Sequence, residues 1–245
     1  MLNRKLQNKR PRPISNGMNF HIITLFPDAF TSYLGESILK RAIEDEKIRV
    51  FFYDPKEYEA DSKKRLDDKP YGGGPGMVIR AEPTIRAIEK AVDTARNFQL
   101  PISNIKEKTK KTTIKIIWLS PSGKEFSNNY AKKAVKKYTD IIIVCGRYEG
   151  IDDRVKKVFK TEDISVGPFV LTGGELPAML IMDVMSRQVS GVLGDINSLE
   201  ELRIASPRVY TRPEILEYKG KKYKVPKVLL SGDHKKIEEW RKEGK

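Results

Sequence analysis

The feature that most constrains this chain is a set of three short apolar runs that end abruptly in glycine or small polar residues. They begin at positions 114, 141 and 164 and read I-K-I-I-W-L-S-P-S-G, I-I-I-V-C-G-R-Y-E-G and I-S-V-G-P-F-V-L-T-G-G-E-L-P. Short runs of β-branched residues with such ends predict buried strands. In open α/β sheets, ligands bind at the carboxyl ends of the strands. The sequence therefore predicts a ligand site where these three runs end.

The third run turns at Gly173 and Gly174 and continues as an apolar helical pattern from Glu175 to about Gln188. Paired glycines let the backbone approach a ligand, or another backbone, where a Cβ atom would collide. Pro177 fits the first turn of a helix, where a missing N–H has no cost. The alternative is a turn that only connects two core elements.

Further strands and helices alternate along the chain, which predicts an α/β fold with a parallel sheet. Strands are expected at Phe20–Phe26, which Pro27 ends, and at Ile48–Tyr53, and helices at Asp28–Glu46 with a break near Gly35, at Glu82–Ala95 and at Asn128–Tyr138. Pro55–Asp68 is expected to be a charged loop.

The segment Lys69–Val78 reads K-P-Y-G-G-G-P-G-M-V and has too many glycines and prolines for regular structure. A Walker loop needs G-x-x-x-x-G-K-[ST], and no Lys-Ser/Thr pair follows here, which argues against a nucleotide triphosphatase. We expect the backbone of this loop to lie close against a ligand or a base.

The formal net charge of +14, with 33% charged residues, favours an anionic partner, nucleic acid before an acidic membrane surface. A generally basic surface is the alternative. Cys145 is the only cysteine, which excludes a disulfide framework, and the two histidines are far apart, which argues against a histidine metal site. No stretch approaches a membrane span, and the N-terminus lacks the apolar region of a secretory signal, so we expect a cytoplasmic protein.

The composition predicts four segments. Residues 1–17 form a flexible basic arm, 18–193 the main domain, 194–205 an interdomain linker and 206–245 a small basic module. The last module interleaves Tyr210, Tyr218, Tyr223 and Trp240 with lysines and arginines, a pattern that suits RNA phosphates and base stacking. Asp233 is expected to cap a helix there.

Eight motifs occur in the order L-F-P, D-D-K-P-Y-G-G-G-P-G-M, L-S-P-S-G, V-C-G-R-Y-E-G-I-D-D-R-V, S-V-G-P-F-V-L-T-G-G-E-L-P-A-M, S-R-Q-V-S-G-V-L-G, Y-T-R-P-E and V-L-L-S-G-D-H, from about Met18 to about Arg241. In kind and order they resemble the bacterial tRNA (guanine-N1)-methyltransferase family (TrmD). The resemblance implies a SPOUT-type α/β domain, with a parallel sheet and a trefoil knot, and a small, mainly helical C-terminal domain. The sequence pattern alone does not predict a knot, since knots are nearly absent among folds.

The resemblance also implies a homodimer that binds S-adenosylmethionine in the knot, depends on Mg²⁺ and methylates N1 of guanosine 37, directly 3′ of the anticodon of tRNA. The strand-end loops would hold the cofactor. Carried over to this sequence, the cofactor-binding residues are Leu119, Ser120, Pro121, Gly146, Glu149, Ser165, Val166, Gly167, Pro168, Phe169, Val170, Leu171, Gly173, Gly174 and Pro177.

Guanine N1 carries a proton at neutral pH, and its removal moves negative charge onto O6, so a base near N1 and a cation near O6 both assist methyl transfer. The family's arginine corresponds to Arg187, whose alternative role is to cap its helix. Where the family has an Asp as the base, this chain has Asn197. We hypothesise that Asp195 or Glu200 replaces this Asp as the base, and Glu201 is a further carboxylate in the same segment. Asn197 would then orient the edge of the guanine base.

The substitution at Asn197 and the short C-terminus leave a second hypothesis open. This alternative is a non-catalytic RNA-binding protein that kept the SPOUT fold and lost the catalytic base. The intact glycine turns and Arg187 favour the enzyme.

Overall fold

The computed structural model describes residues 17–61, 65–97, 113–193 and 208–243. The chain divides into two compact units, Met1–Val192 and Leu193–Lys245, which are described separately. Within the described ranges no helix is both long and apolar enough to cross a bilayer. The predicted arm, except residue 17, and the whole of the predicted linker lie outside these residues.

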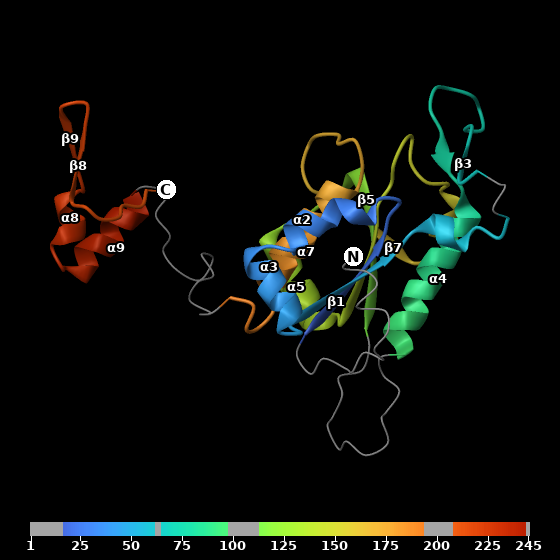
Figure 1. Ribbon diagram of the computed structural model, residues 1–245, viewed down its shortest axis with the longest axis horizontal. Helices are drawn as coiled ribbons and strands as arrows, with labels where there is room; N and C mark the ends of the chain where they lie inside the picture. The colour runs from blue at the N-terminus through green and yellow to red at the C-terminus, as the bar shows by residue number, and fades with distance from the viewer. Residues whose placement is uncertain (1–16, 62–64, 98–112, 194–207, 244–245) are drawn as a thin grey trace, which may run out of the picture. The chain divides into compact units, whose positions relative to one another are not determined.

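The first unit is built on a five-stranded sheet with the order β2-β1-β6-β5-β7 (Figure 1). Every pairing in it is parallel, as predicted. The strands are β1 (Met18–Ile23), β2 (Ile48–Tyr53), β5 (Ile114–Glu125), β6 (Asp140–Val144) and β7 (Thr161–Ser165). Because all five run the same way, their carboxyl ends meet at one edge of the sheet.

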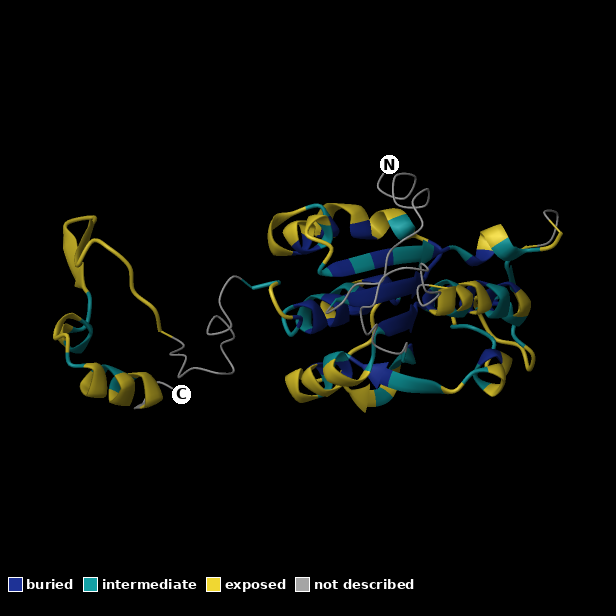
Figure 2. Cartoon of the chain, turned by 90° about the horizontal axis from the view of Figure 1, so that it is seen from below, coloured by how far each residue is buried: buried dark blue, intermediate teal, exposed yellow. Residues whose placement is uncertain are grey.

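Helices cover both faces of the sheet, which gives a three-layer α/β architecture (Figure 1). α3 (Ser37–Glu44), α5 (Asn128–Lys137) and α7 (Glu175–Ser186) pack on one face, and α4 (Ala81–Asn97) and α6 (Arg154–Val158) on the other. The central strands β1 and β6 are buried along their whole length. Figure 2 shows these buried strands between helices whose outer faces are exposed.

The segment after β1 forms η1 (Pro27–Phe30) and α2 (Thr31–Leu34), and α2 ends at Gly35, so the predicted break is confirmed. The prediction that Pro55–Asp68 is only a loop was wrong. It contains η2 (Pro55–Tyr58), which begins because Asp54 accepts the Lys56 N–H at 2.9 Å and proline occupies the first turn. It also contains β3 (Asp67–Asp68), which pairs antiparallel with β4 (Val78–Ile79).

The second unit contains a hairpin, β8 (Ile215–Tyr218) and β9 (Lys221–Lys224), followed by α8 (Lys227–Leu230) and α9 (His234–Glu243). The hairpin was not predicted. The predicted cap is present, since Asp233 accepts the Lys236 N–H at 3.2 Å. None of the described residues of this unit is buried.

Polar side chains are buried between β1 and its neighbours. His21 and Asp140 are almost inaccessible to solvent, with Nε2 of His21 3.0 Å from Oδ1 of Asp140. The same oxygen accepts a hydrogen bond from Asn19, and the other imidazole nitrogen is 2.9 Å from the Tyr53 hydroxyl. Burial raises the pKa of Tyr53, so its phenol stays protonated. Asp140 therefore satisfies two buried polar side chains at once.

Asp140→Ala should lower the free energy of unfolding by about 2–4 kcal/mol, because Asn19 and His21 would each lose a buried partner. Urea denaturation followed by circular dichroism measures this loss. Asp153→Ala, at an exposed carboxylate, is the control and should change stability by less than about 0.5 kcal/mol. Equal stability of the two variants would contradict the assignment.

Candidate functional site

A cavity of about 290 Å³ lies at the carboxyl ends of β5, β6 and β7, where the three glycine-bearing runs end. Of the residues predicted to bind the cofactor, all but Gly167 and Pro168 line it. Arg147, Tyr148, Gly150, Ile164 and Thr172 also line it and were not in the predicted set. Each of these five is adjacent in sequence to a predicted residue, so the motifs that contain them could have indicated them.

Gly167 and Pro168 lie in a tight turn beside the cavity. The Ser165 hydroxyl accepts the N–H of Gly167 at 3.2 Å and donates to its carbonyl oxygen at 2.9 Å, and the Phe169 N–H donates to the same carbonyl. A Cβ atom at Gly167 would lie 2.4 Å from the Phe169 ring. The turn therefore places Phe169 and Val170 on the cavity wall.

The first wall of the cavity is a bulge in β5. The strand was predicted to end at Leu119, but it continues to Glu125. Both Leu119 and Lys124 are in register with Ile164, so the residues between them loop out of the ladder. A Cβ atom at Gly123 would lie 2.5 Å from the Ile164 nitrogen, so only glycine lets the strand close again after the loop.

The second wall is a contact between main-chain segments. The N–H of Gly174, the N-cap of α7, donates to the Gly146 carbonyl at 2.9 Å. A Cβ atom at Gly174 would lie 2.6 Å from the Cα of Cys145. The glycine pair thus brings the start of α7 against the end of β6, the kind of close approach that the sequence predicted.

Charged groups cross-link the loops behind this contact. Nε of Arg147 lies 2.8 Å from Oε2 of Glu175, which is almost fully buried, and Thr24 donates to the other carboxylate oxygen at 2.8 Å. The Arg147 guanidinium packs over the Phe26 ring and donates to the Thr172 carbonyl. Burial raises the pKa of the neighbouring Cys145 thiol, so this cysteine is a neutral core residue.

The third wall is the loop after Arg147, which carries Glu149 and Gly150. A Cβ atom at Gly76 would lie 2.6 Å from the Glu149 side chain, so the glycine-rich segment packs on this loop. Tyr71, near the tip of that segment, is fully exposed. The carboxylate that lines the cavity thus lies next to the glycine-rich segment.

Four of the charged residues after β6 have ion-pair partners, namely Arg147, Asp152, Asp153 and Arg154. Arg154 donates to both carboxylate oxygens of Asp152, at 2.6 to 3.1 Å. These hydrogen bonds lower the pKa of Asp152. The Asp152 carboxylate also accepts the N–H of Arg154, the first residue of α6, at 2.9 Å, so this ion pair has a structural role.

Arg187 ends α7, on the opposite end of the helix from Gly174. Arg187 follows Gly174 by 13 residues, which corresponds to about 20 Å along the helix axis. Within the part of the chain that the structure describes, no hydrogen bond or ion pair of the Arg187 guanidinium is present. The other three predicted catalytic residues, Asp195, Asn197 and Glu200, lie outside the described residues.

A metal site with three protein ligands is not found among the described residues, where no three His, Cys, Asp or Glu side chains gather. Glu149 is the only carboxylate side chain on the cavity wall within that part of the chain.

Comparison with known proteins identifies relatives along almost the whole chain. A family model described as tRNA (Guanine-1)-methyltransferase TrmD matches residues 18–245. A protein named tRNA (guanine-N(1)-)-methyltransferase from Clostridioides difficile is 43% identical over 230 residues, which cover 92% of this chain and 91% of its own. Proteins of the same name from Pseudoalteromonas atlantica and Buchnera aphidicola are 40% and 38% identical, covering 91% of this chain and 78% and 87% of their own.

Gly123→Ala and Gly174→Ala should each lower the free energy of unfolding by about 1–3 kcal/mol, because each added methyl group would meet backbone. Gly146→Ala is the matched control, since the nearest atom to its Cβ is 4.0 Å away. Thermal unfolding of the three variants gives the comparison. If Gly146→Ala cost as much as Gly174→Ala, close main-chain packing would not be the reason for these glycines.

Proposed function

The chain belongs to the tRNA (guanine-1)-methyltransferase family, and we propose that it transfers a methyl group from S-adenosylmethionine to N1 of guanosine 37, directly 3′ of the anticodon. The family membership makes it an enzyme that methylates guanine in tRNA. The methyl donor and the position in tRNA are the proposal. The observation that carries it is the cavity formed where three glycine-bearing strand ends meet.

The chemistry of the cavity lining supports S-adenosylmethionine as the ligand. The cavity volume of about 290 Å³ is at the lower end for small-molecule sites. Leu119, Val166 and Leu171 offer apolar contacts to an adenine ring, and the bare backbone at Gly146 and Gly174 allows close polar contacts. The Glu149 carboxylate complements the positive charge of the ligand. When bound, the nucleotide supplies an electrophilic methyl group on its sulfonium centre.

The rest of the chemistry belongs to side chains of the protein. A guanidinium near guanine O6 stabilises the negative charge that develops as N1 loses its proton, and Arg187 is the residue we assign to this role. A carboxylate near N1 removes the proton, and we assign it to Asp195 or Glu200, with Asn197 orienting the base edge. Mg²⁺ dependence is part of the proposal, and an ion held by one or two carboxylates and several waters needs no three-ligand cluster.

The distance between Arg187 and the cavity leads us to propose a homodimer in which a second chain completes each active site. Within one chain, α7 holds Arg187 about 20 Å from the glycine pair. The solvent side of α7 carries Leu176 and Leu180, one turn apart, which are 58% and 41% exposed. Large exposed apolar side chains on one helix face are typical of a surface for a partner.

The second unit is proposed to contact tRNA. Tyr218 and Tyr223 are exposed on the β8–β9 hairpin among lysines, and the Tyr210 and Trp240 rings lie 6.1 Å apart. Exposed aromatic rings among cations suit stacking on bases and contact with phosphates. The proposed trefoil knot remains a prediction for the first unit.

A single-turnover assay with tRNA transcripts tests the activity. Labelled methyl groups should enter a transcript with G at position 37, and about a hundredfold less should enter one with A there, since adenine has an amino group instead of O6 and so offers no oxygen for the guanidinium. Binding of S-adenosylmethionine without methyl incorporation would contradict the proposal and favour a non-catalytic RNA-binding relative.

Mixed dimers test whether two chains build one site. Gly146→Leu, at a lining glycine whose Cβ would meet nothing closer than 4.0 Å, should block cofactor binding in its own chain, and Arg187→Ala should remove the O6 partner. Each homodimer should then be almost inactive, whereas a mixture should recover up to about a quarter of wild-type activity, because half of the chains sit in mixed dimers with one intact site. Absence of recovery, with mixed dimers confirmed by native mass spectrometry, would contradict a shared site.

A further inference from the structure

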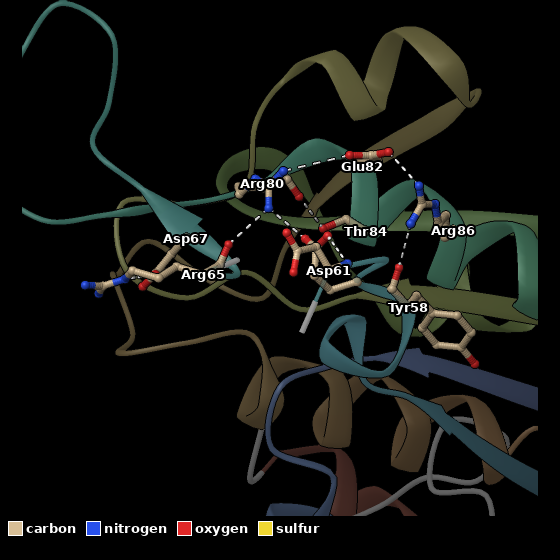
Figure 3. Close-up of polar contacts among 9 residues, drawn as sticks. Tyr58, Asp61, Arg65, Asp67, Arg80, Glu82, Thr84 and Arg86 are labelled. Carbon is tan, nitrogen blue, oxygen red and sulfur yellow. Dashed lines mark hydrogen bonds and ion pairs between the residues drawn. The ribbon is translucent and has the colours of Figure 1, made fainter. Parts of the chain in front are cut away.

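Figure 3 shows a network of charged side chains centred on Arg80. This network has no part in the proposed chemistry. Arg80 stands between β4 and α4, and its side chain is only 25% exposed. Its Nη1 donates to the Glu59 carboxylate at 2.7 Å and to the Arg65 carbonyl at 3.1 Å. The Glu59 side chain is 7% exposed, so Arg80 neutralises a buried charge.

The main chain of Arg80 closes the base of a hairpin. We use the name glycine-rich hairpin for residues 65–80, in which β3 pairs with β4. The Arg80 N–H donates to the Leu66 carbonyl at 2.9 Å, and the Thr84 hydroxyl donates to the Arg80 carbonyl at 2.9 Å. Backbone and side chain of one residue therefore connect the two arms of the hairpin to η2 and α4.

The other edge of β4 is bonded to the cavity wall. The Ile79 N–H donates to the Gly150 carbonyl at 3.0 Å, and the Asp152 N–H donates back to the Ile79 carbonyl at 2.9 Å. The Glu149 N–H donates to the Met77 carbonyl at 3.0 Å. Because Glu149 and Gly150 line the cavity, a shift of β4 moves that wall.

The tip of the glycine-rich hairpin makes few contacts that could fix the position of the hairpin. Gly72, Gly73 and Gly74 have positive φ angles, and a Cβ atom at any of them would meet nothing within 4 Å. Tyr71 is fully exposed. The position of the hairpin is therefore set at its base.

We propose that Arg80 is a positioning residue for the cavity. Its ion pair with Glu59 fixes β4, and β4 holds Glu149 and Gly150 in the arrangement that binds the ligand. The identity of the ligand, S-adenosylmethionine, rests on the proposed function, whereas the coupling from Arg80 to the wall rests on the contacts above.

Arg86 provides a matched control within the same network (Figure 3). It donates to the Tyr58 carbonyl at 3.1 Å and to the Glu82 carboxylate at 2.6 Å. Neither partner belongs to the glycine-rich hairpin. Arg86→Met therefore removes an arginine from the network without releasing the hairpin.

The test compares full-length wild type, Arg80→Met and Arg86→Met by hydrogen exchange and by calorimetry with S-adenosylmethionine. In Arg80→Met, the amides of Ile79, Glu149 and Asp152 should exchange about tenfold faster and the Kd should rise about tenfold. In Arg86→Met, both quantities should stay within about twofold of wild type. Equal exchange rates in the two variants would overturn the proposal.

A double variant separates positioning from stability. Glu59→Gln with Arg80→Met leaves no buried unpaired charge, so the unfolding midpoint should recover towards wild type while the fast exchange and weak binding persist. If the exchange rates and the binding also returned to wild-type values together with the unfolding midpoint, Arg80 would have only a structural role and the proposal would be overturned. If the wild type binds no S-adenosylmethionine, the proposed function fails, and the exchange rates alone decide whether Arg80 positions the wall.

Discussion

The first unit depends on one close approach, the hydrogen bond from the Gly174 N–H to the Gly146 carbonyl. It brings the start of a buried helix against the end of the central strand, at a separation that a Cβ atom at Gly174 would prevent. The bulge in β5 closes by the same device at Gly123. Two glycines therefore let three strand-end loops surround one small cavity. Glycine loses more conformational entropy on folding than other residues, but only glycine allows this close packing.

Behind this contact, a buried carboxylate has the partners that its burial requires. Glu175 is buried behind the cavity and has both Arg147 and Thr24 as partners, as a buried carboxylate requires. Arg187 lies at the far end of α7. A rigid helix cannot bring that guanidinium to the cavity of its own chain, and this is the physical reason for proposing that a second chain takes part in methyl transfer.

The strands, and the edge of the sheet where the cavity lies, could be predicted because runs of β-branched residues and glycine turns are recognisable within a few consecutive residues. The sequence could not reveal that β5 resumes after S-P-S-G, since that depends on register with Ile164 on another strand. α6 is only five residues long, too short for a periodic pattern. The pairs Arg147–Glu175 and Arg80–Glu59 join positions far apart in sequence, so neither was visible before the fold was known. The knot and the cofactor came from the resemblance alone.

The central claim is that bare main chain at three strand ends forms a binding site for S-adenosylmethionine. Isothermal titration calorimetry of the folded wild-type protein with this nucleotide tests it most directly. Saturable heat with one site per chain is the expected result. A folded protein that gives no heat of binding at millimolar nucleotide would contradict it.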